Sequence, residues 1–184
     1  MNLNTQYRTH GFTLIEMIVT TVIMAILASA AVPSFTDTIR RNQVQAQADL
    51  LLSSLVTARS EAAKQNKPVT LCKSGNLSTC TTSGSWEQGW LIFVDNNGDG
   101  TLTAGSDKIV RKFRALPSGY RIHTNATAAD WISYESTGSI RGSGGNGAGN
   151  FRICDSEGTV ENARQIIISI TGRPRQEGNV TSCS

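Results

Sequence analysis

The sequence predicts an α+β fold, with one long N-terminal helix packed against a C-terminal antiparallel β domain. Three observations indicate this. An apolar run near the N-terminus is long enough to cross a membrane as a helix, and a stretch rich in Gln, Ala, Leu and Arg follows it up to Lys67. From Pro68 onward, short apolar runs alternate with segments rich in Gly, Ser and Thr, which is typical of strands joined by loops.

The N-terminal apolar run extends from Phe12 to Val32 and contains a single charged residue, Glu16. About 20 apolar residues are enough to span a bilayer as a helix. A short polar leader, residues 1–11, precedes the run. We therefore expect a transmembrane helix at residues 12–33, directly after the leader.

The order of the N-terminal features differs from that of an ordinary signal peptide. In a signal peptide the small residue at the cleavage site follows the apolar core, whereas here Gly11 precedes it. Cleavage after Gly11 would remove the leader and leave the helix on the mature protein. The run Gly-Phe-Thr-Leu-Ile-Glu, residues 11–16, resembles the type IV prepilin signal. The alternative is a plain membrane anchor with a stray glutamate, although a carboxylate in a membrane helix is costly and rare.

We expect the helix to continue past Pro33, where a proline removes one hydrogen bond and usually produces a kink. Residues 34–67 contain no glycine, and their apolar residues recur every three or four positions, which predicts an amphipathic helix. This apolar stripe consists of Val44, Ala48, Leu51, Leu52, Leu55, Ala58 and Ala62. The helix is expected to end before Pro68, because the residue before a proline avoids helical geometry.

Seven short strands are predicted within the β domain, residues 68–184. They are residues 69–73, 90–94, 109–114, 120–124, 131–134, 151–154 and 165–171. In residues 109–114 we expect Ile109, Arg111 and Phe113 to share one face of a half-buried strand. Residues 142–149 hold five glycines and are expected to form a flexible loop.

All four cysteines follow the apolar run. If they face an oxidising periplasm, two disulfides form. Three pairings are possible, of which we favour Cys72–Cys80, closing a polar loop, and Cys154–Cys183, holding the C-terminal tail. A zinc site is the disfavoured alternative, because the sequence has no Cys-x-x-Cys pair and only two histidines. We predict no metal.

Residues 95–100, Asp-Asn-Asn-Gly-Asp-Gly, resemble the start of a calcium-binding loop. An EF-hand also needs a bidentate glutamate at the twelfth position, where this chain has Ser106. A tight turn is therefore the favoured interpretation, and calcium binding stays open. No catalytic set of residues is present in the sequence, so we predict neither an enzyme nor a cofactor.

Basic residues gather in two regions that are candidates for binding DNA. Residues 108–125 contain no acid and five cations, namely Lys108, Arg111, Lys112, Arg114 and Arg121. The second region is Gly172-Arg173-Pro174-Arg175, in which a proline stiffens the backbone between two guanidinium groups that could meet neighbouring phosphates. The alternatives are a solvated strand face for the first region, and for the second a surface turn whose arginines pair with acids such as Glu177.

Several motifs together resemble the GspH/FimT family of type IV pilin-like proteins. They are the prepilin motif, the Ala-Arg-Ser-Glu-Ala run at residues 58–62, Gly89-Trp90 leading to Phe93-Val94-Asp95, the Asn-Gly-Asp-Gly turn and the final Gly-Arg-Pro-Arg. The resemblance covers nearly the whole chain and implies a type IV pilin-like fold. It also implies an inner-membrane protein with a periplasmic domain that is later assembled into a pilus.

The resemblance implies roles for individual residues. A prepilin peptidase would cut between Gly11 and Phe12, and Phe12 would be N-methylated. Glu16 would neutralise the α-amino group of a neighbouring subunit, since a paired buried charge costs less than a lone one. Arg173 and Arg175 fit a C-terminal motif that FimT-like members use to bind DNA during natural transformation. From the residues themselves, Arg111, Lys112 and Arg114 are further DNA-binding candidates.

Three functions remain open from the sequence. The first is a minor pilin that joins other major and minor pilins and binds double-stranded DNA during uptake. The second is a structural, FimU-like minor pilin that primes or caps the pilus. The third is a GspH-like minor pseudopilin of type II protein secretion.

Overall fold

The computed structural model describes residues 11–178 and 180–183, without the side chains of residues 30–34. Residues 1–10, which make up most of the predicted leader, lie outside the described part. The chain forms two compact units, residues 1–39 and 40–184. The helix α1 (Leu14–Gln65) contributes to both, and it continues past residue 33 as the sequence predicts.

The first unit contains the segment predicted to cross a membrane. Within the described side chains, no helical stretch combines the length and the apolarity needed to cross a bilayer. The last four residues of the predicted span 12–33, residues 30–33, have side chains outside the described set. The span and its kink therefore stay predictions.

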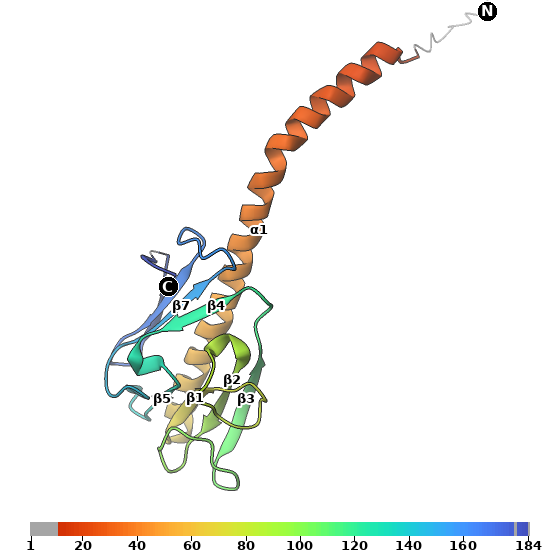
Figure 1. Ribbon diagram of the computed structural model, residues 1–184. Coiled ribbons are helices and arrows are strands. Elements are labelled where there is room, and N and C mark those ends of the chain that lie inside the picture. The colour runs from red at the N-terminus through yellow and green to blue at the C-terminus, as the bar shows by residue number, and fades with distance from the viewer. Residues whose placement is uncertain (1–10, 179, 184) are drawn as a thin grey trace, which may run out of the picture. The chain divides into compact units, whose positions relative to one another are not determined.

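The described residues of the second unit form nine strands. They are β1 (Val69–Lys73), β2 (Gly89–Val94), β3 (Lys108–Arg114), β4 (Arg121–Thr124), β5 (Trp131–Tyr134), β6 (Ile140–Gly142), β7 (Gly149–Cys154), β8 (Arg164–Ile168) and β9 (Pro174–Glu177). Two 3-10 turns, η1 (Trp86–Gln88) and η2 (Ala126–Ala128), interrupt the connections. Figure 1 shows the strands beside the C-terminal part of α1.

The strands form two antiparallel sheets. One has five strands in the order β3-β2-β1-β5-β6, and the other has four in the order β4-β7-β8-β9. The basic strand β3 and the strand β9, which carries Arg175, are therefore outer strands of different sheets. Together with α1 the sheets confirm the predicted α+β, pilin-like fold.

The apolar stripe of α1 packs into the main core of the second unit. Six of its seven predicted members, all except Leu52, have no exposed surface, and Leu52 is half-buried against them. A polar residue on the same face, Ser54, is also buried and accepts a hydrogen bond from the Trp90 indole N–H at 3.1 Å. This bond joins α1 to β2, and it satisfies the only donor of a fully buried indole.

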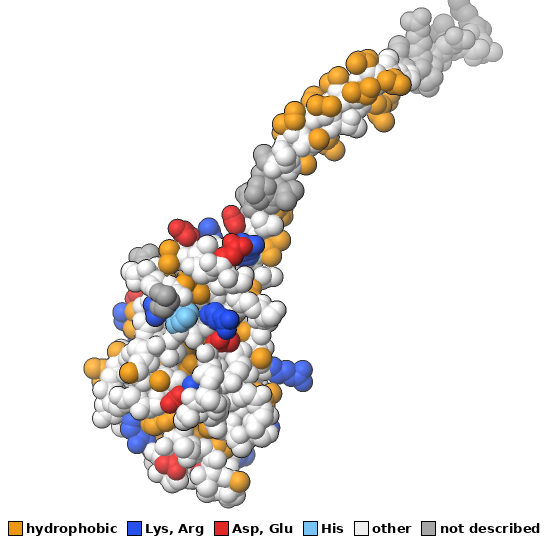
Figure 2. All heavy atoms as spheres, in the orientation of Figure 1, with side chains coloured by type: hydrophobic (Ala, Val, Ile, Leu, Met, Phe, Trp, Pro, Cys, Tyr) orange, Lys and Arg blue, Asp and Glu red, His pale blue; other side chains and the backbone are white. Residues whose placement is uncertain are grey.

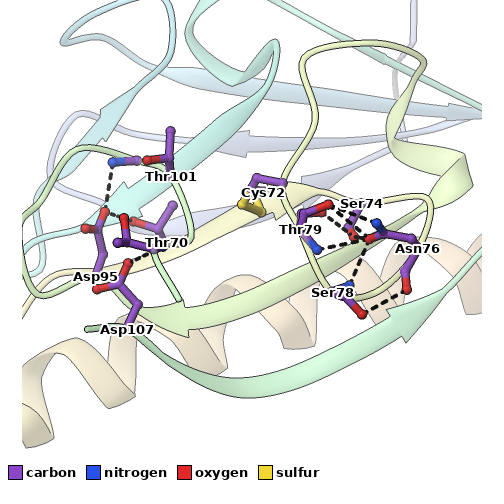
Figure 3. Close-up of a disulfide and its surroundings, with 12 residues drawn as sticks. Thr70, Cys72, Ser74, Asn76, Ser78, Thr79, Asp95, Thr101 and Asp107 are labelled. Carbon is purple, nitrogen blue, oxygen red and sulfur yellow. Dashed lines mark hydrogen bonds between the residues drawn. A yellow bond between two sulfur atoms is a disulfide. The ribbon is translucent and has the colours of Figure 1, made fainter. Parts of the chain in front are cut away.

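Both favoured disulfides are present. Cys72 on β1 is joined to Cys80, and Cys154 on β7 is joined to Cys183. The first closes a polar loop that Asn76 organises by accepting hydrogen bonds from the backbone of Ser78 and Thr79 (Figure 3). The second ties the C-terminal tail to an inner strand of the four-stranded sheet.

Two strands were missed by sequence reasoning, β6 and β9. The first has only three residues next to the glycine-rich segment. The second, Pro-Arg-Gln-Glu, is polar and starts with proline, a residue that a sheet accepts at the first position of a strand or on an outer strand.

The glycine-rich segment, residues 142–149, corrects a second expectation. A Cβ on Gly142 would lie 1.9 Å from the Thr127 carbonyl oxygen, and one on Gly144 would lie 2.3 Å from that of Ala126. The Asn125 side chain also donates to the Ala148 carbonyl at 2.7 Å. Gly142 and Gly144 therefore allow a close backbone approach to η2, and this part of the segment is packed where a flexible loop was predicted.

Candidate functional site

The N-terminal segment begins α1 with an N-cap hydrogen bond. The Glu16 amide donates to the Thr13 hydroxyl at 3.3 Å, and Thr13 directly precedes the helix. A carboxylate in the first turn also faces the positive end of the helix dipole. Thr13 is a local partner that sequence reasoning missed, although the spacing Thr-x-x-Glu was visible. Glu16 thus has a local role in starting the helix.

The apolar side chains around Glu16 are exposed. Phe12 and Leu14 each have 79% of their surface exposed. The large apolar side chains that follow along the helix, as far as Leu27, are also exposed, with smaller exposed fractions. This contrasts with the second unit, where six of the seven members of the α1 stripe are completely covered. The first unit is therefore a helix whose apolar surface is not covered by described residues of its own unit.

The turn after β2 uses its carboxylates to fold the backbone (Figure 3). Asp95 is buried, and its two oxygens accept hydrogen bonds from Gly98 N, Gly100 N and the Thr70 hydroxyl at 2.7–2.9 Å. Asp107 holds the far side of the same turn by accepting from the backbone of Asn96 and Thr103. In the part of the chain that the structure describes, no cluster of His, Cys, Asp or Glu is suited to a metal ion. The geometry is that of the tight turn favoured from the sequence.

Strand β3 carries the first basic region, but its faces differ from the prediction. The pairing with β2 shifts register between Ile92 and Phe93, which is a β-bulge. Ile109 therefore packs with Phe93 in a small satellite cluster, whereas Phe113 stacks on Trp90 at 5.2 Å in the main core. The expectation that Ile109 and Phe113 share one face is wrong, because an extra residue reverses the alternation.

The cations of β3 are exposed and form no ion pair with a described acid. Lys108, Arg111, Lys112 and Arg114 are all exposed. None of the ion pairs formed among the described residues uses these side chains. Arg121, on β4, differs because its guanidinium lies 3.4 Å from Glu87. Of the five cations in this region of the sequence, four therefore lie on one outer strand and form no ion pair with a described residue.

The second basic region is a turn between β8 and β9 that a glycine makes possible. Gly172 has φ +77°, and a Cβ there would lie 1.8 Å from the Gly138 carbonyl oxygen. Ser169 closes the turn by accepting from Gly172 N at 2.7 Å and by donating its own amide to the Arg173 carbonyl at 3.2 Å. The Ser169 hydroxyl accepts from Arg173 N at 3.2 Å. The backbone of Arg173 is therefore fixed.

The two arginines of this turn are not equivalent. Arg173 is exposed, and no described acid pairs with it. Arg175 lies on β9, where its Nε is 2.7 Å from a Glu177 oxygen. Residues two apart on a strand point to the same face, which places the pair side by side. The alternative interpretation, an arginine paired with Glu177, is thus correct for Arg175.

The two basic regions lie near α1 residues that point to different sides of the helix. A hydrogen bond from Gln65 is the main cause that lowers the pKa of the Glu61 carboxyl, and the nearby charge of Arg111 adds a smaller effect in the same direction. Arg59 instead donates from Nη2 to the Thr171 carbonyl at 3.3 Å. Glu61 and Arg59 are two residues apart, so their side chains point in directions that differ by roughly 200° around the helix axis. On the face drawn in Figure 2, the Lys and Arg side chains of the second unit are likewise spread out and do not form one patch.

Comparisons with known proteins agree with this architecture. The family model described as type II transport protein GspH matches residues 47–172, and the prokaryotic N-terminal methylation motif matches residues 7–32. No curated protein matches the sequence.

Solved structures give the fold. Two crystal structures of the type IV minor pilin FimU from Pseudomonas aeruginosa are 23% identical to this chain, with TM-scores of 0.59 and 0.57. They cover 78% and 76% of this chain and 97% and 99% of their own. The minor pseudopilin EpsH from the type 2 secretion system of Vibrio cholerae is 10% identical, with a TM-score of 0.48, and covers 73% of this chain and 96% of its own.

The GspH family model covers more than half of the chain, and the separate methylation-motif model matches the segment before it. The chain belongs to the GspH family of type IV pilin-like proteins.

Proposed function

We propose that the chain is a minor pilin, processed at its N-terminus, anchored in the inner membrane and then assembled into a type IV pilus. Gly11 and Phe12 form the proposed cleavage site of a prepilin peptidase, and Phe12 is the proposed N-methylated residue. The match of residues 7–32 to the methylation motif supports this. In cells that contain the peptidase, the mass of the mature protein should correspond to a start at methylated Phe12, and a protein that keeps Met1 contradicts the proposal.

Assembly is proposed to bury the exposed apolar surface of the first unit among other major and minor pilins. Apolar area removed from water stabilises association by about 25 cal/mol per Å². Glu16 is proposed to pair there with the α-amino group of a neighbouring Phe12, because an unpaired charge in such a core is costly. The Glu16→Leu variant should remain in the membrane and be nearly absent from sheared pili, as an immunoblot of both fractions would show.

The exposed domain is proposed to bind double-stranded DNA through its backbone phosphates during uptake for natural transformation. The observation that carries this proposal is the set of exposed cations without acidic partners, four on β3 and Arg173 in the fixed turn. Arginine binds phosphate oxygens bidentately. Such contacts give affinity without reading base sequence.

Binding is tested with the full-length chain in detergent micelles and a labelled duplex, by fluorescence anisotropy over a salt series. A plot of the logarithm of the binding constant against the logarithm of the salt concentration should be a falling straight line. Its slope should steepen by about 0.9 for each phosphate neutralised. Two duplexes of unrelated sequence should bind equally. The Arg173→Gln variant should lose about 0.9 of the slope.

Absence of binding by the wild-type chain would overturn the DNA proposal and leave the structural roles. A FimU-like subunit that primes or caps the pilus would then show itself by loss of pili on deletion of the gene. A pseudopilin of type II secretion would show itself by loss of protein secretion with pili intact.

A further inference from the structure

Arg59 of α1 lies beside the turn that carries Arg173. Its Nη2 donates to the Thr171 carbonyl at 3.3 Å, two residues before Arg173. This contact joins two parts of the sequence 112 residues apart, the Ala-Arg-Ser-Glu-Ala run of the helix and the Gly-Arg-Pro-Arg turn. The proposed DNA site therefore has a cation from α1 at its side.

Space around this guanidinium is kept open by Gly138. A Cβ on Gly138 would lie 3.2 Å from Nε and 3.3 Å from Nη2 of Arg59, and Gly138 itself has φ +85°. The carbonyl oxygen of Gly138 also lies next to Gly172, where a Cβ would be 1.8 Å from it. The Gly138 backbone is thus close to both the helix arginine and the turn.

A cavity of about 390 Å³ opens next to Arg59. Four residues of α1 between Val56 and Ala63 line it on one side, and residues 136–138 of the β5–β6 connection line it on the other. Ser60, Ser136 and Thr137 also line it, but the Ser60 hydroxyl donates to the Thr57 carbonyl at 2.9 Å and the Thr137 hydroxyl is hydrogen-bonded to that of Ser139. The Arg59 guanidinium, with the Ser136 hydroxyl in the same wall, provides the donors that phosphate oxygens need.

The charge of Arg59 is not neutralised within the described part of the chain. No ion pair there includes Arg59. A guanidinium has five N–H donors, and the contact with Thr171 is the only hydrogen bond of the side chain among the described residues. The acidic residue nearest in sequence, Glu61, lies on another side of the helix and interacts with Gln65 and Lys64. Donors therefore remain for an anion from outside.

We propose that Arg59 and this cavity form a second phosphate subsite, beside that of Arg173, so that a DNA backbone contacts α1 as well as the turn. This inference rests on the proposed DNA binding. It names a residue outside the C-terminal motif, and it makes the site a two-point contact.

The test compares salt slopes of duplex binding for the full-length chain, its single variants Arg59→Gln and Arg173→Gln, and the double variant. The salt slope should be smaller than that of the wild type by about 0.9 in each single variant and by about 1.8 in the double variant, because two separate phosphate contacts are lost. The Arg59→Lys variant should keep most of the slope, since it keeps the charge. Arg41→Gln, an exposed cation elsewhere on α1, is the matched control and should change little.

The outcomes separate this inference from the proposed function. If Arg59 only positions the turn, the double variant behaves like Arg173→Gln alone, and the subsite is excluded. If Arg59→Gln binds like the wild type while Arg173→Gln is weakened, the subsite is also excluded but the DNA proposal survives. If the wild-type chain does not bind, both proposals fail. Circular dichroism melting of each variant shows whether a loss of binding reflects unfolding instead.

Discussion

Strand β3 and the Gly172–Arg175 turn present the same kind of charge in opposite ways. The strand offers four cations, unpaired among the described residues, on long side chains along an outer strand with a bulge. The turn offers one unpaired arginine, but its backbone is fixed by Ser169 and by a glycine contact with Gly138. The strand therefore provides more charge, and the turn provides more defined geometry. A count of basic residues ranks the two regions by charge alone and misses this difference.

The largest expected effect concerns the charge of the strand. Replacing Arg111, Lys112 and Arg114 together by Gln should reduce the salt slope of DNA binding by about 2.7, if each contacts one phosphate at about 0.9. Folding should change little, because these side chains are exposed and unpaired among the described residues. A triple variant with the same loss of charge elsewhere, Arg41, Lys64 and Lys67 to Gln, is the control. Equal losses in both would mean that only the net charge of the chain matters.

The faces of β3 show what the sequence could and could not predict. The apolar stripe of α1 follows from a period of three to four residues, so six of its seven members were placed correctly in the core. The face on which each β3 cation lies depends on a bulge opposite Ile92 and Phe93. A bulge is a property of the pairing between two strands, and no local pattern in either strand reveals it.

The same limit applies to the turn. The motif Gly-Arg-Pro-Arg was recognised, but β9 was not, since a short polar strand beginning with proline resembles a loop. Without β9, the pairing of Arg175 with Glu177 could not be distinguished from a free arginine. The contact of Arg59 with Thr171 joins residues that are 112 apart and depends on the whole fold.

A smaller effect is expected from Gly172→Ala, which tests geometry without changing charge. The new Cβ would lie 1.8 Å from a backbone oxygen, so the turn must rearrange, and a positive φ adds about 1–2 kcal/mol for a residue with a side chain. DNA binding should fall to the level of Arg173→Gln. The control is Gly105→Ala, which has φ +89° but open space around its Cβ. It should show only the backbone cost in thermal unfolding and keep the binding of the wild type.

The smallest effect is expected from Glu177→Gln, which makes the two arginines of the turn alike. The carboxylate now neutralises Arg175 at 2.7 Å and would repel an approaching phosphate. Its removal should raise DNA affinity at low salt and increase the slope by up to about 0.9. Stability should hardly change, because an exposed ion pair contributes about 0–1 kcal/mol. The gain should vanish in Glu177→Gln with Arg175→Gln. A gain that persists in this double variant would show that the carboxylate acts on the phosphate directly and that Arg175 takes no part in the site.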